Sequence, residues 1–284
     1  MKTNIVKSYA KINIGLNVSG KRSDGYHDLD MVMVPVKLHD TIIFTEVANR
    51  DHDSVTLDDF SVVVERKNTI TKAIDFFNKE SATKKHFSIL VHKVIPIKGG
   101  FGGGSSNAAA TLLLMNKVFK KNYDFVTLEN MGLKIGADVP FFVRNVPCRC
   151  KGVGEKLEPI KILKDYFVLI VKPEDGCSTK EVFEKSDLLD LKACNIDDVV
   201  KALETGDDEL LASSLVNSLE EPACLLVPEI KDIIIKLRNY GFDIVSMTGS
   251  GSGVYALSHN KKLIKQAARF LEDKYTVEVT KIIR

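Results

Sequence analysis

The sequence predicts a two-domain α+β protein. Its 284 residues exceed the usual length of one domain, which is roughly 100 to 200 residues. Strand and helix patterns are mixed along the chain, and several strands adjoin one another as antiparallel neighbours do. A new set of elements begins after about residue 153, so we expect one domain over residues 1–153 and a second over residues 154–284.

The first domain begins with strands. Alternating and β-branched residues predict strands over residues 5–18, 31–36, 41–47 and 86–92, with a turn at 23–25. Between the last two strands, Asn68 precedes the helical pattern ITKAIDFFNKE. Its short amide side chain can accept hydrogen bonds from the free amides of a first turn, so we expect a helix to begin there.

A glycine-rich segment follows, PIKGGFGGGSSNAAA over residues 96–110. Five of the six residues from Gly99 to Gly104 are glycine, and helical spacing then continues to Phe119. Glycines let backbone amides approach an anion closely, and the helix start adds unpaired N–H groups and a positive dipole end. We therefore predict a phosphate site at this glycine loop (residues 99–104). A flexible linker is the alternative.

Two common nucleotide motifs do not fit this loop. A Walker A sequence needs a lysine where this chain has a serine, and no G-x-G-x-x-G follows a strand. A second helix is expected over residues 126–135, stopped by Gly136.

The second domain again mixes strands and helices. Strands are expected over residues 166–171 and 276–282 and on both sides of residues 249–253. Helical patterns cover residues 197–203, 208–219, 228–241 and 263–274.

Composition excludes several classes of protein. Forty basic and 38 acidic residues give a net charge of +2, too little for the basic surface that nucleic acid binding needs. The apolar runs are much shorter than the roughly 20 residues of a membrane span, and the first residues lack a signal-peptide core. We expect a cytoplasmic protein with no nucleic acid or membrane partner. Its five scattered cysteines indicate reduced thiols.

Three motifs together resemble one family. The glycine segment looks like P-x-x-x-G-L-G-S-S-A, the central motif of the GHMP kinases, and SYAKINIGLNV and MTGSGSGVYAL resemble the first and third motifs in the expected order. The resemblance implies the two-domain GHMP kinase fold, in which a ribosomal protein S5 domain 2-like domain precedes a ferredoxin-like domain. It also implies ATP as the phosphoryl donor, with Mg²⁺.

Narrower features indicate the acceptor. RSDGYHDLD, IGADVPFFV and KPEDGCSTKEVF resemble the GHMP kinases whose substrate is cytidine diphosphate-linked methylerythritol, phosphorylated on its 2-hydroxyl in the non-mevalonate isoprenoid route. Two alternatives stay open. One is a GHMP kinase for homoserine, mevalonate or a sugar, and the other is a non-catalytic nucleotide-binding relative.

The resemblance assigns Lys11 and Asp138 as the catalytic pair. Asp138 could accept the hydroxyl proton, and Lys11 could stabilise the developing charge. From the residues alone, a turn aspartate is the favoured interpretation of Asp138 before Pro140, and only the resemblance reverses this. Lys11 lies in an alternating strand, so it points either to water or into a site.

The resemblance also assigns the substrate residues. Tyr26 and Phe183 would stack on the two faces of cytosine, and His27 would contact the edge of the base. Asn13 and Thr179 match positions near the diphosphate, although small polar residues can also close turns. Without the resemblance, Phe183 is an ordinary core residue and the turn residues are surface residues.

For ATP, Asn68 matches a position that binds adenine, and the helix-cap interpretation is compatible with this. The phosphates are expected at the remaining motif residues, which are Pro96, Gly99, Gly100, Gly102, Gly103, Gly104, Ser105 and Ser106. No acidic cluster in the sequence indicates the ligands of Mg²⁺. We expect a monomer or a weak homodimer. Three residues depart from the family pattern: Lys98, Phe101 and Ser218.

Overall fold

The computed structural model describes residues 2–48, 52–58, 64–83 and 85–284. Two compact units are present, and each is built from separate stretches of chain. The first unit consists of Met1–Ala10, His39–Ile95 and Gly102–Asn145. The second unit consists of Lys11–Leu38, Pro96–Phe101 and Val146–Arg284.

Two long strands, β1 (Thr3–Lys21) and β2 (His27–Val47), pair with each other and contribute residues to both units. In the first unit, β4 (His86–His92) pairs antiparallel with the end of β2, from Thr41 opposite His92 to Val47 opposite His86. β3 (Ser54–Leu57) lies parallel to β4 on its other side.

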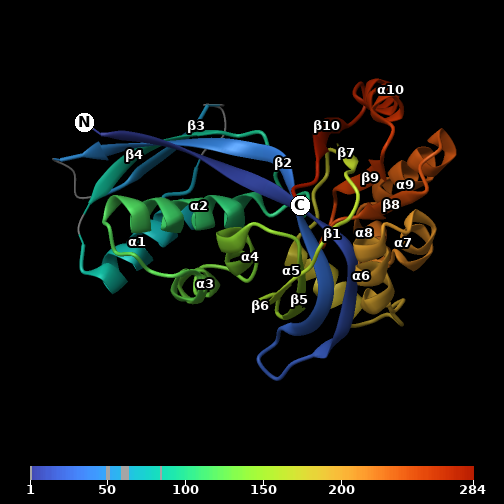
Figure 1. Cartoon of the computed structure of the whole chain (residues 1–284), viewed down its shortest axis with the longest axis horizontal. Helices are drawn as coiled ribbons and strands as arrows, with labels where there is room; N and C mark the ends of the chain where they lie inside the picture. Colours follow the sequence, from blue (N-terminus) through green and yellow to red (C-terminus); the bar gives the residue numbers. More distant parts are fainter. Residues whose placement is uncertain (1, 49–51, 59–63, 84) are drawn as a thin grey trace. The chain divides into compact units, whose positions relative to one another are not determined.

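The described residues of the first unit also form four helices: α1 (Thr69–Ser81), α2 (Gly103–Val118), α3 (Phe125–Leu133) and α4 (Val139–Arg144). Figure 1 shows α1 and α2 against one side of β2 and β4, and α4 contacts α2 and α3. α1 begins where expected because the Asn68 side chain accepts hydrogen bonds from the amides of Ile70 and Thr71 in a capping box. The interpretation of Asn68 as a helix cap is therefore confirmed.

The second unit contains a four-stranded antiparallel sheet of order β10-β7-β9-β8. Its strands are β7 (Phe167–Lys172), β8 (Ile244–Met247), β9 (Val254–Ser258) and β10 (Thr276–Lys281). Since helices separate β7 from β8 and β9 from β10, the chain follows the β-α-β-β-α-β pattern of ferredoxin-like domains. The first part of β2 also pairs with β5 (Cys148–Gly152), which pairs with β6 (Lys156–Pro159).

Six helices belong to the second unit: α5 (Thr179–Ser186), α6 (Ile196–Thr205), α7 (Asp208–Ser214), α8 (Glu220–Leu226), α9 (Glu229–Tyr240) and α10 (Lys261–Leu271). α9 contacts β8 and β9, and α10 contacts β7, β9 and β10 (Figure 1). α9 buries Ile230, Ile233, Ile234 and Leu237, which recur at helical spacing and explain why the periodic pattern predicted it.

Most predicted elements are confirmed, with shifts at their ends, but the strands predicted over residues 31–36 and 41–47 are parts of one strand, β2. The helix predicted over residues 208–219 was wrong in its second half, since α7 ends at Ser214. Leu215 is extended, and the following residues pair with Leu16 of β1 instead of continuing the helix. The sequence did not predict β3, α4, β5, β6, α5 or α8. The contiguous domain boundary at 153/154 stays a prediction.

Candidate functional site

The first half of the glycine loop packs on a second glycine-rich segment, the glycine hairpin (residues 248–253), which joins β8 to β9. The amide of Gly253 donates to the carbonyl of Gly99 at 3.1 Å. Gly100 has a left-handed φ of +78°, and a methyl group there would lie 2.2 Å from the carbonyl oxygen of Thr248. Glycine is therefore required at Gly100 by both conformation and space.

The second half of the glycine loop opens helix α2 in the first unit. Gly102 is the N-terminal cap with φ +71°, and Gly103, Gly104, Ser105 and Ser106 form the first turn. With no side-chain cap at Gly102, the amides of this turn suit an anion such as phosphate.

A buried ion pair lies under this turn. The Lys93 ammonium donates to Asp40 at 2.8 Å, and burial lowers the pKa of Lys93. A methyl group on Gly103 would lie 3.1 Å from Lys93 Nζ, so this cation is close to the start of α2. Asp40 also accepts the amides of Val94 and Ile95, which fixes the chain just before the glycine segment.

Other predicted residues of the first unit lie around the same turn. A methyl group on Gly104 would be 3.6 Å from Thr69 Oγ1, directly after Asn68. A methyl group on Gly136 would be 3.8 Å from Ser105 Oγ, and Asp138 follows two residues later at the start of α4. Within the described helix α4, the Asp138 side chain does not serve as the cap. The start of α1, the start of α2 and the Asp138 turn are thus neighbours.

In the second unit, Lys11 and Asn13 lie buried on β1, with 3% and 1% of their surface exposed. The Lys11 ammonium donates to the Asn13 side-chain oxygen. Thr248 Oγ1 accepts the Asn13 amide at 3.0 Å, and a methyl group on Gly249 would lie 3.1 Å from Lys11 Nζ. Lys11 and Asn13 are therefore in contact with the glycine hairpin.

Helix α5 extends this group of residues. The hydroxyls of Thr179 and Ser250 are 2.9 Å apart, which joins the start of α5 to the hairpin. One turn later on the same face, Phe183 stacks on the His27 ring, with centroids 4.7 Å apart and planes at 22°. The predicted substrate residues Asn13, His27, Thr179 and Phe183 thus form a continuous series in the second unit.

An aspartate holds the histidine of this series. His27 Nε2 is 2.6 Å from Asp187 Oδ1, and Lys21 pairs with the other oxygen. Hydrogen bonds from Lys21 and His27 lower the pKa of Asp187 and keep it ionised. Tyr26 is 61% exposed, so its ring can reach a ligand without displacing a neighbour in the core.

The three departures from the family pattern have separate explanations. Phe101 is buried, and its ring packs directly against Gly99 of the glycine loop and Gly253 of the hairpin. The exposed Lys98 has φ +55°, and its side chain packs over Gly176. The Ser218 hydroxyl donates to the carbonyl of Lys192 at 2.8 Å.

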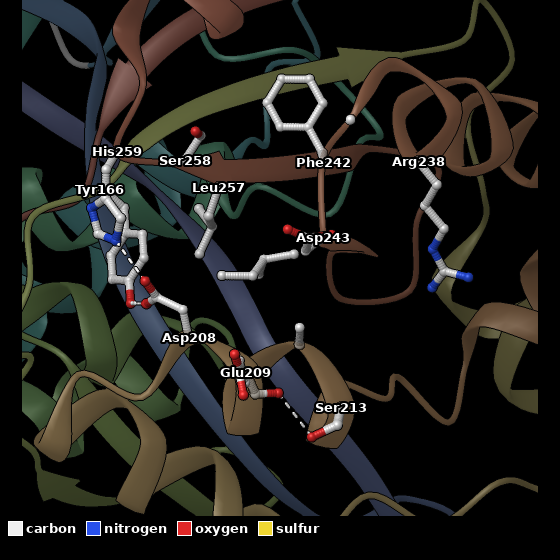
Figure 2. A pocket seen from close by; sticks show the side chains of 13 residues that line it. Tyr166, Asp208, Glu209, Ser213, Arg238, Phe242, Asp243, Leu257, Ser258 and His259 are labelled. Atoms are coloured by element: carbon white, nitrogen blue, oxygen red, sulfur yellow. Dashed lines mark hydrogen bonds and ion pairs between the residues drawn. The ribbon is translucent and has the colours of Figure 1, made fainter.

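A separate hollow of about 800 Å³ lies at the opposite ends of β8 and β9 from the hairpin. Figure 2 shows Asp208, Tyr166 and His259 together on one wall and Arg238 on another. Asp208 accepts from the Tyr166 hydroxyl at 2.6 Å and from Lys164 at 2.8 Å, and His259 Nε2 lies 3.0 Å away. Because these groups satisfy one another, we interpret this wall as a structural network.

Two features are absent from the described part of the chain. It contains no group of three or more His, Cys, Asp or Glu side chains that could hold a metal ion. No helix in these residues is long and apolar enough to cross a bilayer.

Several residues of the site were missed from the sequence. Thr248 lies inside the third motif but was not singled out, and Asp187 lies four residues after Phe183 at one helical turn. Asp40 and Lys93 are separated by 53 residues, so no local pattern joins them.

The fold, the glycine loop and the hairpin define a two-unit α+β protein, and comparison with known proteins identifies its class. The family model for the GHMP kinase N-terminal domain matches residues 68–145, and that for the C-terminal domain matches residues 199–277. This chain belongs to the GHMP kinase family, and the predicted two-domain α+β fold is confirmed.

Individual relatives give more specific information than the family models. The chain is 36% identical to the 4-diphosphocytidyl-2-C-methyl-D-erythritol kinase of Clostridium perfringens, over 95% of this chain and 94% of that protein. A crystal structure of 4-(cytidine 5'-diphospho)-2C-methyl-D-erythritol kinase superposes with a TM-score of 0.82 at 27% identity, covering 98% of this chain and 99% of the other.

The solved structure of a kinase for another acceptor is similar to this chain in fold alone. The homoserine kinase of Cytophaga hutchinsonii superposes with a TM-score of 0.76, covering 100% of this chain and 95% of the other, but the sequences are 16% identical.

Proposed function

We propose that this protein transfers the γ-phosphate of ATP to the 2-hydroxyl of 4-diphosphocytidyl-2-C-methyl-D-erythritol, a step of non-mevalonate isoprenoid biosynthesis. The observation that carries the proposal is the 36% identity, over 95% of the chain, to a kinase named for this substrate. A kinase for homoserine, mevalonate or a sugar and a non-catalytic relative are the alternatives, and the identity to kinases of this name favours the cytidyl substrate over both.

The start of α2 is the proposed site of the ATP phosphates. The amides of Gly103 to Ser105 precede the first intrahelical bond, from Ser106 N to Gly102 O, and lie at the positive end of a helix, and Lys93 adds a nearby cation. Mg²⁺ neutralises triphosphate charge during phosphoryl transfer. Since the described residues form no acidic metal cage, we expect the triphosphate itself, with Ser105 or Ser106, to hold the ion. Asn68 and the start of α1 would face adenine.

Lys11 and Asp138 are the proposed catalytic residues. Asp138 would accept the proton of the attacking hydroxyl, and Lys11 would stabilise the negative charge that develops on that oxygen. The burial of Lys11 supports this role, because a buried ammonium interacts strongly with a developing charge.

Cytosine is proposed to bind between Tyr26 and Phe183, with His27 at its edge. The stacked pair of His27 and Phe183 and the exposed Tyr26 ring support an aromatic base site. Asn13 and Thr179 both bond to the hairpin, and Thr179 lies one helical turn before Phe183, which suits contact with the diphosphate. We further propose a cytoplasmic monomer or weak homodimer whose partner is this small molecule, with no nucleic acid or membrane partner.

A product assay tests the proposal. Purified protein with MgATP and the cytidyl substrate should yield ADP and a phosphorylated product, whose added phosphorus couples to the 2-position carbon in ³¹P and ¹³C NMR. Homoserine, mevalonate, galactose and methylerythritol phosphate serve as competing acceptors. Equal turnover of any of these would refute the narrow assignment, and no turnover of any acceptor would favour the non-catalytic relative.

A further inference from the structure

A short segment of the second unit, residues 216–218, lies between strand β1 and the glycine hairpin. Its backbone pairs with β1, because Leu16 N donates to Val216 O at 3.0 Å and Ser218 N donates to Leu16 O at 2.9 Å. On its other side, Asn217 Nδ2 donates to the carbonyls of Met247 and Gly249, both at 2.9 Å. The segment therefore connects the strand that carries Lys11 to the hairpin that touches it.

We propose that Asn217 is a positioning residue for the reaction, which holds the hairpin in register with Lys11. Asn217 itself is 5% exposed, and its Oδ1 accepts the amide of Leu219 at 3.0 Å. The two N–H groups and the oxygen of this side-chain amide all bond to backbone groups. Only one orientation of the amide satisfies all three bonds. This inference rests on the proposed function.

The position of the hairpin decides the position of the ammonium. Gly249, whose carbonyl accepts from Asn217, lies so close to Lys11 that a methyl group on it would be 3.1 Å from Nζ. The preceding residue, Thr248, accepts the amide of Asn13 and lies 3.4 Å from its side-chain oxygen, the acceptor for Lys11. Movement of the hairpin by one ångström would therefore shift Lys11, and such displacements are costly in catalysis.

Only a primary amide fits this position. An aspartate would keep the acceptor for Leu219 but turn a second oxygen toward two carbonyls, and both would lose their donor. When that carboxyl is protonated it regains one O–H donor, so the defect of Asn217→Asp is reversible with pH. Alanine loses every contact and has no such reversal.

The kinetic test compares Asn217→Asp and Asn217→Ala with the wild type and with Asn116→Asp. Asn116 is the matched control, because its amide also bridges a backbone, donating to Tyr123 O at 2.9 Å and accepting Tyr123 N at 3.0 Å. We expect both Asn217 variants to lose about tenfold or more in kcat, with a smaller change in the KM of ATP. Asn116→Asp should lower Tm and leave kcat within twofold. The kcat of Asn217→Asp should recover partly as pH falls, relative to wild type, and that of Asn217→Ala should not.

A second readout is independent of turnover. Acetylation of Lys11 by acetic anhydride, followed by mass spectrometry, should be slow in the wild type and several-fold faster in Asn217→Ala, while Lys93 is unchanged. Normal kcat in folded Asn217 variants together with unchanged Lys11 labelling would overturn the inference. If the wild type phosphorylates no acceptor, the proposed function fails, and the labelling result alone decides whether Asn217 positions Lys11.

Discussion

Lys11 illustrates what one residue can and cannot reveal in a sequence. Strand alternation left two possibilities for it, water or a site. The structure buries Ala10, Lys11 and Ile12 alike, so both faces of β1 are covered and alternation alone could not decide. The three family motifs identified Lys11 because they compare whole sites, whereas periodicity reports only one face of one element.

The catalytic pair gives the first prediction. Lys11→Ala and Asp138→Asn should each lower kcat by about a hundredfold or more, in the range of a positioned acid–base or charge-stabilising group. Steady-state assays with MgATP and the cytidyl substrate measure the change, and a thermal melt verifies that each variant is folded. Near-normal turnover by a folded variant would remove that residue from the mechanism.

Asp187 gives a second prediction at this scale. Its carboxylate holds the His27 ring in place against Phe183, so Asp187→Ala should release the ring. We expect the KM of the cytidyl substrate to rise about tenfold, the effect of roughly 1.4 kcal/mol, because hydrogen bonds to charged groups contribute about this much. The KM of ATP should not change.

Lys21→Ala is the matched control for Asp187, since it removes the other ion pair of the same carboxylate and leaves the bond to His27. It should change the KM of the cytidyl substrate less than twofold. An equal rise in KM with both variants would show that loss of the Lys21–Asp187 ion pair, rather than of the bond to His27, is responsible.

At the scale of elements, local signals were sufficient where they were strong. The Asn68 cap, the glycines before α2 and the apolar stripe of α9 each predicted an element that the structure confirms. The second half of the predicted 208–219 helix failed because pairing with Leu16, about 200 residues earlier, outweighs local helix propensity. Pairing between distant segments also explains why β5 was missed, since β5 pairs with β2.

The glycine loop gives a prediction that separates its contribution to the stability of the fold from its contribution to ATP binding. Gly100→Ala should destabilise the fold by about 2 kcal/mol or more, because its φ is left-handed and the new methyl group meets the Thr248 carbonyl. Gly104→Ala has 3.6 Å of space and should keep the wild-type Tm. If the phosphates bind at this turn, Gly104→Ala should still raise the KM of ATP. Denaturant melts and ATP titrations measure the two effects separately.

Helix α8 gives a prediction about pH. Burial raises the pKa of Glu220 above its ordinary value, so its contribution to stability is fully present at low pH and is lost as pH rises through the folded pKa. Glu220→Gln removes this loss and should have a higher Tm than wild type at pH 8, with the difference shrinking toward pH 4.5. The neighbouring exposed Glu221→Gln should follow the wild-type curve. Parallel curves for Glu220→Gln and wild type would contradict the assignment.

At the scale of the whole molecule, the chain alternates between two units. The second unit takes its residues from 11–38, 96–101 and 146–284, so no single cut yields a complete unit. Composition and pattern predicted two domains with a contiguous boundary. Pattern cannot detect interleaving, because each segment looks like ordinary strand or loop wherever it is finally placed.

Fragments test this arrangement. We expect residues 1–153 and 154–284, expressed separately, to lack a cooperative thermal transition, because fragment 154–284 is without the buried strand residues Ile12 and Ile14 and without Phe101. Circular dichroism melts of each fragment and of the intact chain provide the comparison. A sharp melt of fragment 154–284 alone would show that its sheet and helices are a sufficient folding unit.

The hydrogen bond between Asn13 and Thr248 also has a consequence for protein synthesis. The two residues are 235 positions apart. At about 5 to 20 residues per second, a ribosome needs roughly 12 to 47 seconds to make the chain between them. During that time β1 can pair with β2, but its partners in residues 216–218 and in the glycine hairpin have not yet been made, so this edge of β1 is open to other chains. We therefore expect this protein to depend on chaperones that bind early segments, and its soluble yield to improve when such chaperones are co-expressed.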